Sequence, residues 1–462
     1  MKDLTTGSVT RQLLEMAAPI SASVIAQILY YLVDLYFVAR LGSAAVSGVT
    51  AAGAVILIAM ALMDVLVVAI VTLIAHAAGR QDAQEVNVLF NQAVSLCAAC
   101  AVATAVASYT LGNAYVAAIA ADEQTAAFGS AYIRWFIPGL LITQIVFVPL
   151  SAALRGMGTP VPALIAQLFG LVVHLLLAPI LIAGWFTQRP LGVVGAALAS
   201  AIAMVCSSLL LVVYFIRKAD SLSLAPRQWR PHWPQWRRMV SIGLPLGADR
   251  ALTLFGTTLV FWLIRDFGPA AQAGFAVGTR VLQVIAIPLT ALAYAAVPLA
   301  GQNFGARKYD RVRETFRRTF VICLIIALVT TLLAQLNPRS LVAPFSEDPQ
   351  ALAAAMLFMQ IMCWSLLAHA VICTNWALFR AIGHTWPALL TAGARLVLFA
   401  VAGAWLSTLP SFDVAMVWWL LLASLVLQAL LGLKLLNLEF AKRLWSPTLR
   451  DEKAGLKNSP VS

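Results

Sequence analysis

The sequence has 462 residues, of which 61% are hydrophobic and only 11% are charged, and its mean hydropathy is +0.89. This composition excludes an ordinary soluble globular protein and predicts an integral membrane protein. The net charge of +12 does not require a nucleic-acid partner, because the basic residues fall in alternate loops between apolar segments.

Apolar segments of about 20 residues recur along the whole chain, and each is long enough to cross a ~30 Å hydrocarbon core as a helix. We expect an all-α integral membrane protein with no soluble domain. The polar N-terminus is not followed by a short apolar stretch with a cleavage site, so no cleaved signal peptide is expected. The twelve expected spans are 14–39, 51–75, 90–111, 130–151, 162–184, 193–216, 239–264, 275–299, 319–336, 351–377, 386–407 and 414–436.

The distribution of lysine and arginine predicts the orientation. If both termini are cytoplasmic, the inside segments carry 23 of these residues and the outside loops carry 4. The positive-inside rule therefore places both ends in the cytoplasm of a multi-pass protein of a bacterial inner membrane. We expect a monomer whose partners are the lipid bilayer and small amphipathic substrates, with no nucleic acid.

The chain also contains an internal repeat. Since the repeat covers six spans, the two halves keep the same orientation and should be related by a pseudo-two-fold axis along the membrane normal, with substrate bound between them. We expect an N-lobe over 1–216, a cytoplasmic linker over 217–238, a C-lobe over 239–437 and a cytoplasmic tail over 438–462. The repeated pairs lie 226 or 225 residues apart: Pro19 and Pro245, Gly42 and Gly268, Gly48 and Gly274, Gly79 and Gly305, Arg155 and Arg380, Gly158 and Gly383, Pro162 and Pro387.

The cysteines indicate no further chemistry. All six lie within apolar segments, where a thiol serves as a small hydrophobic group, so we expect neither disulfides nor a metal site.

Six short segments, in order along the chain, resemble signatures of the multidrug and toxic compound extrusion (MATE) transporters. They are "VDLYFVARLGSAAVSG", "IAHAAGRQD", "SAALRGMGTP", "SIGLPLGADR", "PLAGQNFGARKYDRVR" and "ALFRAIGHTWPAL". The resemblance implies two six-helix lobes and no enzymatic activity. It also implies export of amphipathic, often cationic compounds, driven by inward flow of protons or sodium. It assigns Asp34 to the position of an acidic residue that belongs to the cation site of the N-lobe.

The sequence departs from the family pattern at several acidic positions. Family members often carry an Asn and an Asp on the fifth helix, where this chain has His174 and Ala178. Two acids of the sodium-coupled branch are replaced by Thr253 and His369, whereas Asp249 matches an acidic position of other members. We therefore expect protons, with sodium as the alternative, to be the coupling ion, and no other cofactor.

Asp34 is the strongest candidate for cation coupling. A carboxylate among apolar neighbours costs several kcal/mol unless it is paired or protonated. This cost favours the protonated form, so Asp34 can bind and release a proton reversibly. The alternative is an interfacial Asp34 paired with Arg40. His174 lies at a comparable depth in the same half, so it either shares a proton with Asp34 or is a core histidine bonded to a neighbouring helix.

Other residues are candidates for substrate contacts or for structural roles. Asp64 either lines the cavity or pairs with Arg134 or Gln144. His369 stands at a functional position of the sodium-coupled branch but has a different chemistry, so both a direct and a structural role stay open. Asp249 and Arg250 are expected to form a local ion pair, and Arg280 and Arg395 to bond carbonyls or acids within the C-lobe. Besides Asp34 itself, the candidates for substrate contact, several of them through cation–π interactions, are Asp64, Tyr30, Tyr31, Gln144, Phe255, Trp262 and His369.

Two rival functions remain. A lipid-linked precursor flippase of the same superfamily would be expected to show more basic residues inside its spans than Arg280 and Arg395. A membrane enzyme could use His174 or His369 as a base, but the sequence shows no metal-ligand cluster and no spacing of a nucleophile and a base. A repeated chain without a soluble domain favours transport.

Overall fold

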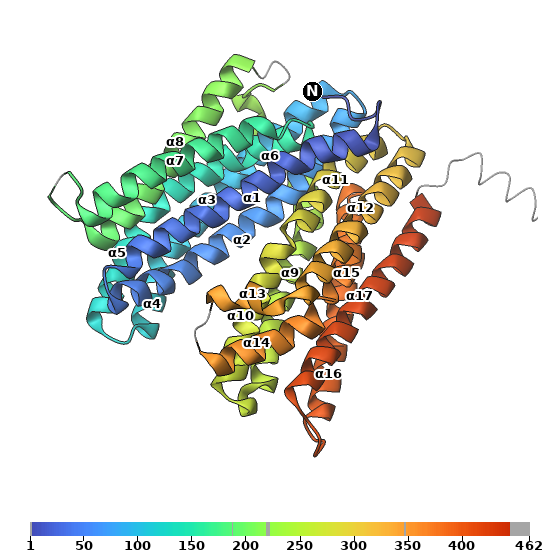
Figure 1. Cartoon of the computed structure of the whole chain (residues 1–462). Coiled ribbons are helices and arrows are strands. Elements are labelled where there is room, and N and C mark those ends of the chain that lie inside the picture. The colour runs from blue at the N-terminus through green and yellow to red at the C-terminus, as the bar shows by residue number, and fades with distance from the viewer. Residues whose placement is uncertain (1, 187, 219–221, 346–347, 444–462) are drawn as a thin grey trace, which may run out of the picture. The chain divides into compact units, whose positions relative to one another are not determined.

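A computed structural model describes residues 2–186, 188–218, 222–345 and 348–443, and this part of the chain is built from helices without a β-strand (Figure 1). Each of the twelve expected spans lies within one helix or within two or three consecutive helical segments, and none extends past these by more than one residue, although several of the helices are longer than the expected span. The chain divides into two compact units. The first contains residues 1–3 and 18–247, and the second contains residues 4–17 and 248–462.

The first unit contains helices α2 to α8, together with most of α1 and the start of α9. In this unit α7 and α8 pack side by side (Figure 1), and π-helical turns over 108–112 and 143–147 join α3 to α4 and α5 to α6. The helices are α1 (Val9–Ala39), α2 (Ser43–Gly79), α3 (Ala83–Ala107), α4 (Asn113–Ile119), α5 (Glu123–Ile142), α6 (Val148–Gly156), α7 (Val161–Ala183), α8 (Gly192–Lys218) and α9 (Trp233–Leu263).

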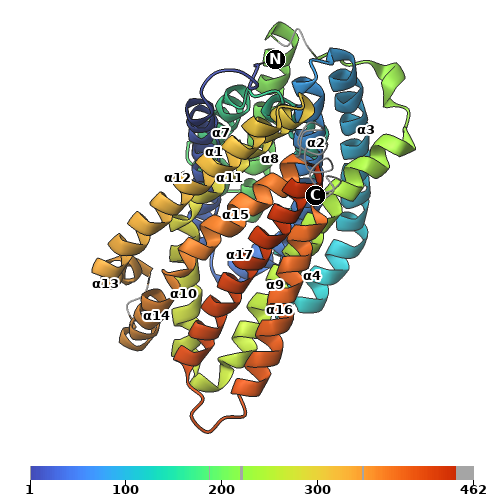
Figure 2. The same ribbon diagram turned by 90° about the vertical axis from the view of Figure 1, so that its right-hand side faces the viewer.

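The second unit contains the rest of α9 and the helices that follow it. Two expected spans are bent here, by 47° between α10 and α11 and by 57° between α14 and α15. Helices α15, α16 and α17 pack side by side (Figure 2). The helices are α10 (Pro269–Ile285), α11 (Ile287–Gly305), α12 (Tyr309–Leu336), α13 (Pro338–Val342), α14 (Pro349–Met362), α15 (Ser365–Ala381), α16 (Trp386–Leu406) and α17 (Val414–Arg443).

Most of these helices are long and apolar enough to cross a membrane. Within the described residues there are nine such segments, and eleven if each bent pair is one span. The seventh expected span, 239–264, forms α9 and is not among them; its apolar part contains the adjacent charged residues Asp249 and Arg250. The chain is thus a multi-pass helical membrane protein.

The local backbone repeats between the two units at the positions where helices end. Gly42 and Gly268 precede α2 and α10 with φ of 102° and 87°. Gln81 and Arg307, also 226 residues apart, both have φ of 59° in the turns that follow α2 and α11. Because non-glycine residues rarely adopt positive φ, this match supports the repeat independently of the glycine and proline pairs.

The described part of the expected linker, 217–238, is bound to α3 of the first unit. Asn91, which is fully buried, accepts hydrogen bonds from the backbone N–H of Ala225 and from the indole N–H of Trp229, both at 2.9 Å. Its amide also donates to the Ser223 carbonyl at 2.9 Å. A single buried side chain therefore fixes three points of the linker.

Replacing Asn91 by Leu should loosen the linker. The change leaves the Ala225 and Trp229 donors without their acceptor. Since both donors are at least partly exposed and can bond to water instead, each lost hydrogen bond should cost about 0.5–1.5 kcal/mol. We expect a lower melting temperature of the detergent-purified protein and faster proteolysis within 222–232. Asn113→Leu is the control, because that exposed amide bonds only within its own helical segment. Equal proteolysis of both variants would show that Asn91 does not hold the linker.

Candidate functional site

Asp34 of α1, Tyr132 of α5 and His174 of α7 meet inside the first unit. The Tyr132 hydroxyl donates a hydrogen bond of 2.9 Å to Asp34 Oδ2. His174 Nε2 lies 3.7 Å from Asp34 Oδ1, within the range of an ion pair but too far for a hydrogen bond. The His174 side chain is completely buried and the Asp34 side chain is 15% exposed, so Asp34 is the more accessible of the two to an incoming cation.

Tyr30 holds the imidazole of His174 in place. The two rings stack with centroids 4.0 Å apart and an interplanar angle of 19°. The Tyr30 hydroxyl donates to the backbone carbonyl of Ser200 in α8 at 3.1 Å. Tyr30 and Asp34 are four residues apart on α1 and so share one face of the helix, which explains why both approach His174.

Several polar atoms of this site have no hydrogen bond within the described residues. They are Asp34 Oδ1, both ring nitrogens of His174 and the Ser200 hydroxyl oxygen, although the Ala199 carbonyl lies near the imidazole. Buried polar groups normally have hydrogen-bond partners, so these atoms are available to bind a proton, a cation or a water molecule. We call Asp34, Tyr132, His174, Tyr30 and Ser200 the Asp34 cluster.

Glycines let the helices that carry this cluster come close together. A Cβ on Gly139 of α5 would lie 2.4 Å from the Ala201 Cα of α8. A Cβ on Gly195 of α8 would lie 2.2 Å from the Leu181 carbonyl oxygen of α7. Only glycine permits such backbone contact, so the sequence of α5 and α8 sets the spacing of the cluster.

Arg40 does not pair with Asp34. Its guanidinium lies 4.4 Å from the centre of the Tyr36 ring and donates a hydrogen bond to the Tyr36 hydroxyl. The interfacial Asp34–Arg40 pair considered from the sequence is therefore replaced in the structure by Tyr132 and His174. Tyr31 is 65% exposed and is not part of the cluster.

The structure places the other candidates of the first unit away from Asp34. Gln144 is buried, donates to the Ala59 carbonyl and accepts from the Thr104 hydroxyl, each at 3.2 Å. Asp64 is exposed on α2, and Arg134 lines a separate pocket on α5.

The remaining candidates belong to the second unit and form no common site there. Phe255 and Trp262 of α9 are 61% and 48% exposed, and Trp262 packs against Arg265. His369 Nε2 lies 3.2 Å from the Cys373 Sγ of its own helix. Arg280 is exposed on α10.

Asp249 lies in a wider group of charges than the expected pair with Arg250. It is buried and lies within electrostatic range of Arg380 and Arg395 as well as Arg250. Arg395 Nε is buried without a hydrogen bond in the described part of the chain. This arrangement favours a structural role for Asp249.

Sequence reasoning missed Tyr132 and Ser200. Neither residue type is unusual in a membrane helix, and only the rotation of α5 and α8 about their axes turns Tyr132 towards Asp34 and brings Ser200 to Tyr30. Across the described residues, no group of three His, Cys, Asp or Glu side chains could hold a metal ion.

Fold and site together define a two-unit helical membrane protein with a buried, titratable cluster in the first unit. The MatE family model matches residues 19–180 and again residues 245–406, so the second match begins 226 residues after the first. The chain belongs to the MATE family, and the predicted two-lobed all-α fold of that family is confirmed.

Relatives of known name support this assignment. The multidrug export protein MepA of Staphylococcus haemolyticus is 24% identical over 392 residues, which cover 84% of this chain and 85% of that protein. MepA of Staphylococcus saprophyticus is 26% identical over 370 residues, covering 79% and 80%.

Solved structures show the same fold. A MOP superfamily transporter from Pyrococcus furiosus superposes with a TM-score of 0.87 at 20% identity, covering 96% of this chain and 98% of that one. An outward-facing multidrug resistance MATE transporter gives a TM-score of 0.87 at 19% identity, with the same coverage.

Proposed function

We propose that this protein is a secondary active multidrug exporter that exchanges amphipathic, often cationic compounds for protons by alternating access. The buried Asp34 cluster carries the proposal, and the MepA relatives, which are multidrug export proteins, support the substrate class. The distribution of basic residues supports a bacterial inner membrane location with both termini in the cytoplasm.

Exchange follows from competition for one carboxylate. Protonation of Asp34 and binding of a cationic compound both neutralise the same charge, so the two ligands exclude each other. Asp34 is partly exposed whereas His174 is completely buried, and the protonated imidazole of His174, at 3.7 Å, would form an ion pair with Asp34. Asp34 and His174 would therefore share one proton as a coupled pair.

The ligand set favours a proton over sodium. Hard cations take several oxygen ligands, and the cluster offers the Asp34 carboxylate, the Tyr132 hydroxyl and the Ser200 hydroxyl. The nearest additional group is an imidazole nitrogen, which suits a proton.

The energy of one proton sets the scale of transport. Entry down 100 mV releases about 2.3 kcal/mol, which sustains a gradient of roughly 50-fold for a neutral substrate. A one-for-one exchange with a monovalent cation moves no net charge, so it depends on the pH difference alone.

Export of ethidium from proteoliposomes tests the proposed coupling. We expect a pH gradient to drive export and a sodium gradient at clamped pH to drive none. A membrane potential without a pH difference should also be ineffective if the exchange is one-for-one. Export driven by sodium at clamped pH would overturn proton coupling.

Tyr132→Phe should weaken coupling without unfolding the protein. The substitution removes the hydrogen bond from Tyr132 to the Asp34 carboxylate, and such a bond to a charged group is worth about 1.5–3 kcal/mol. We expect pH-driven ethidium export to fall about tenfold or more. Tyr31→Phe, which removes a hydroxyl from an exposed tyrosine next to Tyr30, is the control. Equal export by both variants would exclude Tyr132 from the site.

His174→Asn should shift the pH profile of export while Asp34 remains in place. Histidine has an ordinary pKa of about 6.5, and the amide that replaces it does not titrate. The profile is measured as the initial export rate against external pH at a fixed pH difference. An unchanged profile would leave His174 as a core residue that only packs against Tyr30.

A further inference from the structure

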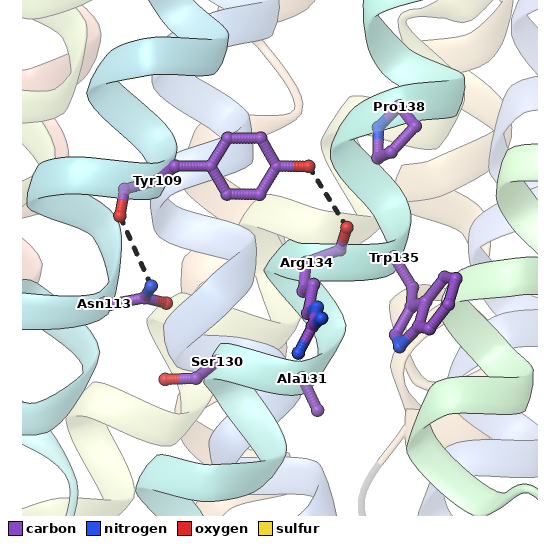
Figure 3. Close-up of a pocket in the computed structure, with 7 residues that line it drawn as sticks. All are labelled: Tyr109, Asn113, Ser130, Ala131, Arg134, Trp135 and Pro138. Atoms are coloured by element: carbon purple, nitrogen blue, oxygen red, sulfur yellow. Dashed lines mark hydrogen bonds between the residues drawn. The ribbon is translucent and has the colours of Figure 1, made fainter.

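An open pocket of about 660 Å³ lies on the first unit where the π-helical turn between α3 and α4 meets α5 (Figure 3). The Tyr109 hydroxyl reaches across it and donates to the Arg134 backbone carbonyl at 3.1 Å, and the Asn113 amide donates to the Tyr109 carbonyl at 3.3 Å. Its lining includes Tyr109, Asn113, Ser130, Arg134, Trp135 and Pro138.

The pocket presents a cation, the Arg134 guanidinium, which has no counter-ion among the residues that the structure describes. Arg134 is exposed, and its guanidinium forms no ion pair within the described residues. Its backbone carbonyl, not its side chain, is the group that bonds to Tyr109. The five N–H donors of the guanidinium are therefore directed to a ligand or to solvent.

The pocket is separate from the Asp34 cluster. Tyr132 is buried and turned towards Asp34, whereas Arg134, two residues later, lies on a different face of α5. Trp135 and Pro138 continue the exposed face at helical spacing. A role for the pocket is thus independent of the proposed exchange of protons and substrates.

The depth of the pocket corresponds to the edge of the hydrocarbon core. Arg134 lies four residues inside the expected span 130–151, which is about 6 Å at 1.5 Å per residue. Tyr109 lies two residues from the end of the expected span 90–111. Tyrosine and tryptophan collect at this level, and a long arginine side chain can reach the headgroups from it.

We propose that this pocket binds the phosphate of an anionic phospholipid headgroup. The Arg134 guanidinium matches a phosphate oxygen pair in a bidentate contact. Asn113 and Ser130 offer polar groups for the headgroup or glycerol oxygens, and Trp135 offers an apolar surface for the start of an acyl chain. The positive charge disfavours a cationic compound in the same place.

Native mass spectrometry of the detergent-purified full chain tests this site. The protein is titrated with phosphatidylglycerol or phosphatidylcholine as wild type, Arg134→Gln and Arg134→Lys. We expect wild type to bind phosphatidylglycerol in preference, Arg134→Gln to lose about tenfold in that affinity, and Arg134→Lys to retain part of it. Arg265→Gln is the matched control, because that arginine has Asp266 as its counter-ion at 3.4 Å.

Three results would overturn the proposal. The first is an equal affinity of Arg134→Gln and wild type for phosphatidylglycerol while both elute as a single species. The second is binding of phosphatidylcholine as tight as that of phosphatidylglycerol. The third is displacement of phosphatidylglycerol by an equal concentration of inorganic phosphate, which would assign the pocket to a free anion.

Discussion

Asp34→Asn is expected to abolish pH-driven export while leaving the protein folded. The amide keeps the shape of the carboxyl group, and its oxygen can still accept the hydrogen bond from Tyr132. The amide cannot bind and release a proton, so the pH gradient no longer drives export of the substrate. Accumulation of ethidium against its gradient, which one-for-one exchange sustains at about tenfold per unit of pH difference, should fall to equilibration.

The measurement is ethidium export from proteoliposomes under an imposed pH gradient or an imposed sodium gradient. Asp122→Asn is the control for loss of a carboxylate in the same unit. Asp122 caps α5 by accepting the Thr125 N–H at 2.7 Å, which holds the pKa of this carboxyl below its ordinary value, and asparagine caps a helix equally well. Gradient-driven export by Asp34→Asn at the rate of the control would remove Asp34 from the mechanism.

The apolar spans could be predicted because a bilayer imposes their length, and the repeat could be predicted because turns require particular residues. Gly42 and Gly268 stand where φ is positive, so the sequence marks the same turn twice. The bends between α10 and α11 and between α14 and α15 depend on packing between helices. No run of hydrophobic residues indicates them.

Within the site, the depth of each residue in the membrane could be predicted from the sequence, but the rotation of each helix about its axis could not. Counting residues along two spans places Asp34 and His174 at similar depths, and the structure brings them together. The contact of Asp34 with Tyr132 joins residues 98 apart in sequence and depends on which face of α5 meets α1. For the same reason, the sequence offered Arg40 as a partner of Asp34, whereas in the structure Arg40 packs against Tyr36.

The two units differ at the repeat position that Asp34 occupies in the first unit. The residue 226 positions after Asp34 is Val260, which is 3% exposed and packs in the hydrophobic core of the second unit with Leu263 and Phe275. An acid at the first position and a valine at the second favour a single coupling site in the first unit. The buried Asp249 of the second unit lies within electrostatic range of Arg250, Arg380 and Arg395, an arrangement that favours a structural role.

Gly139→Leu should disrupt the packing that builds the Asp34 cluster. Gly139 lies seven residues, about two turns, after Tyr132 and on the same face of α5. A Cβ at this position would lie 2.4 Å from the Cα and 2.7 Å from the Cβ of Ala201, which follows Ser200. A leucine must push α8 away from α5, and this moves Ser200, whose carbonyl anchors Tyr30, relative to the helix that carries Tyr132.

We expect Gly139→Leu to be destabilised by about 1–3 kcal/mol or more, the usual range for overpacking, and to lose most of its pH-driven export. The melting temperature of the detergent-purified protein and ethidium export from proteoliposomes measure the two effects. Gly53→Leu of α2 is the control, because nothing lies within 4 Å of a Cβ placed there. Since α5 and α8 meet through backbone atoms, relaxation of side chains cannot make room for the leucine. Wild-type stability and export in Gly139→Leu would therefore show that the two helices are not in backbone contact.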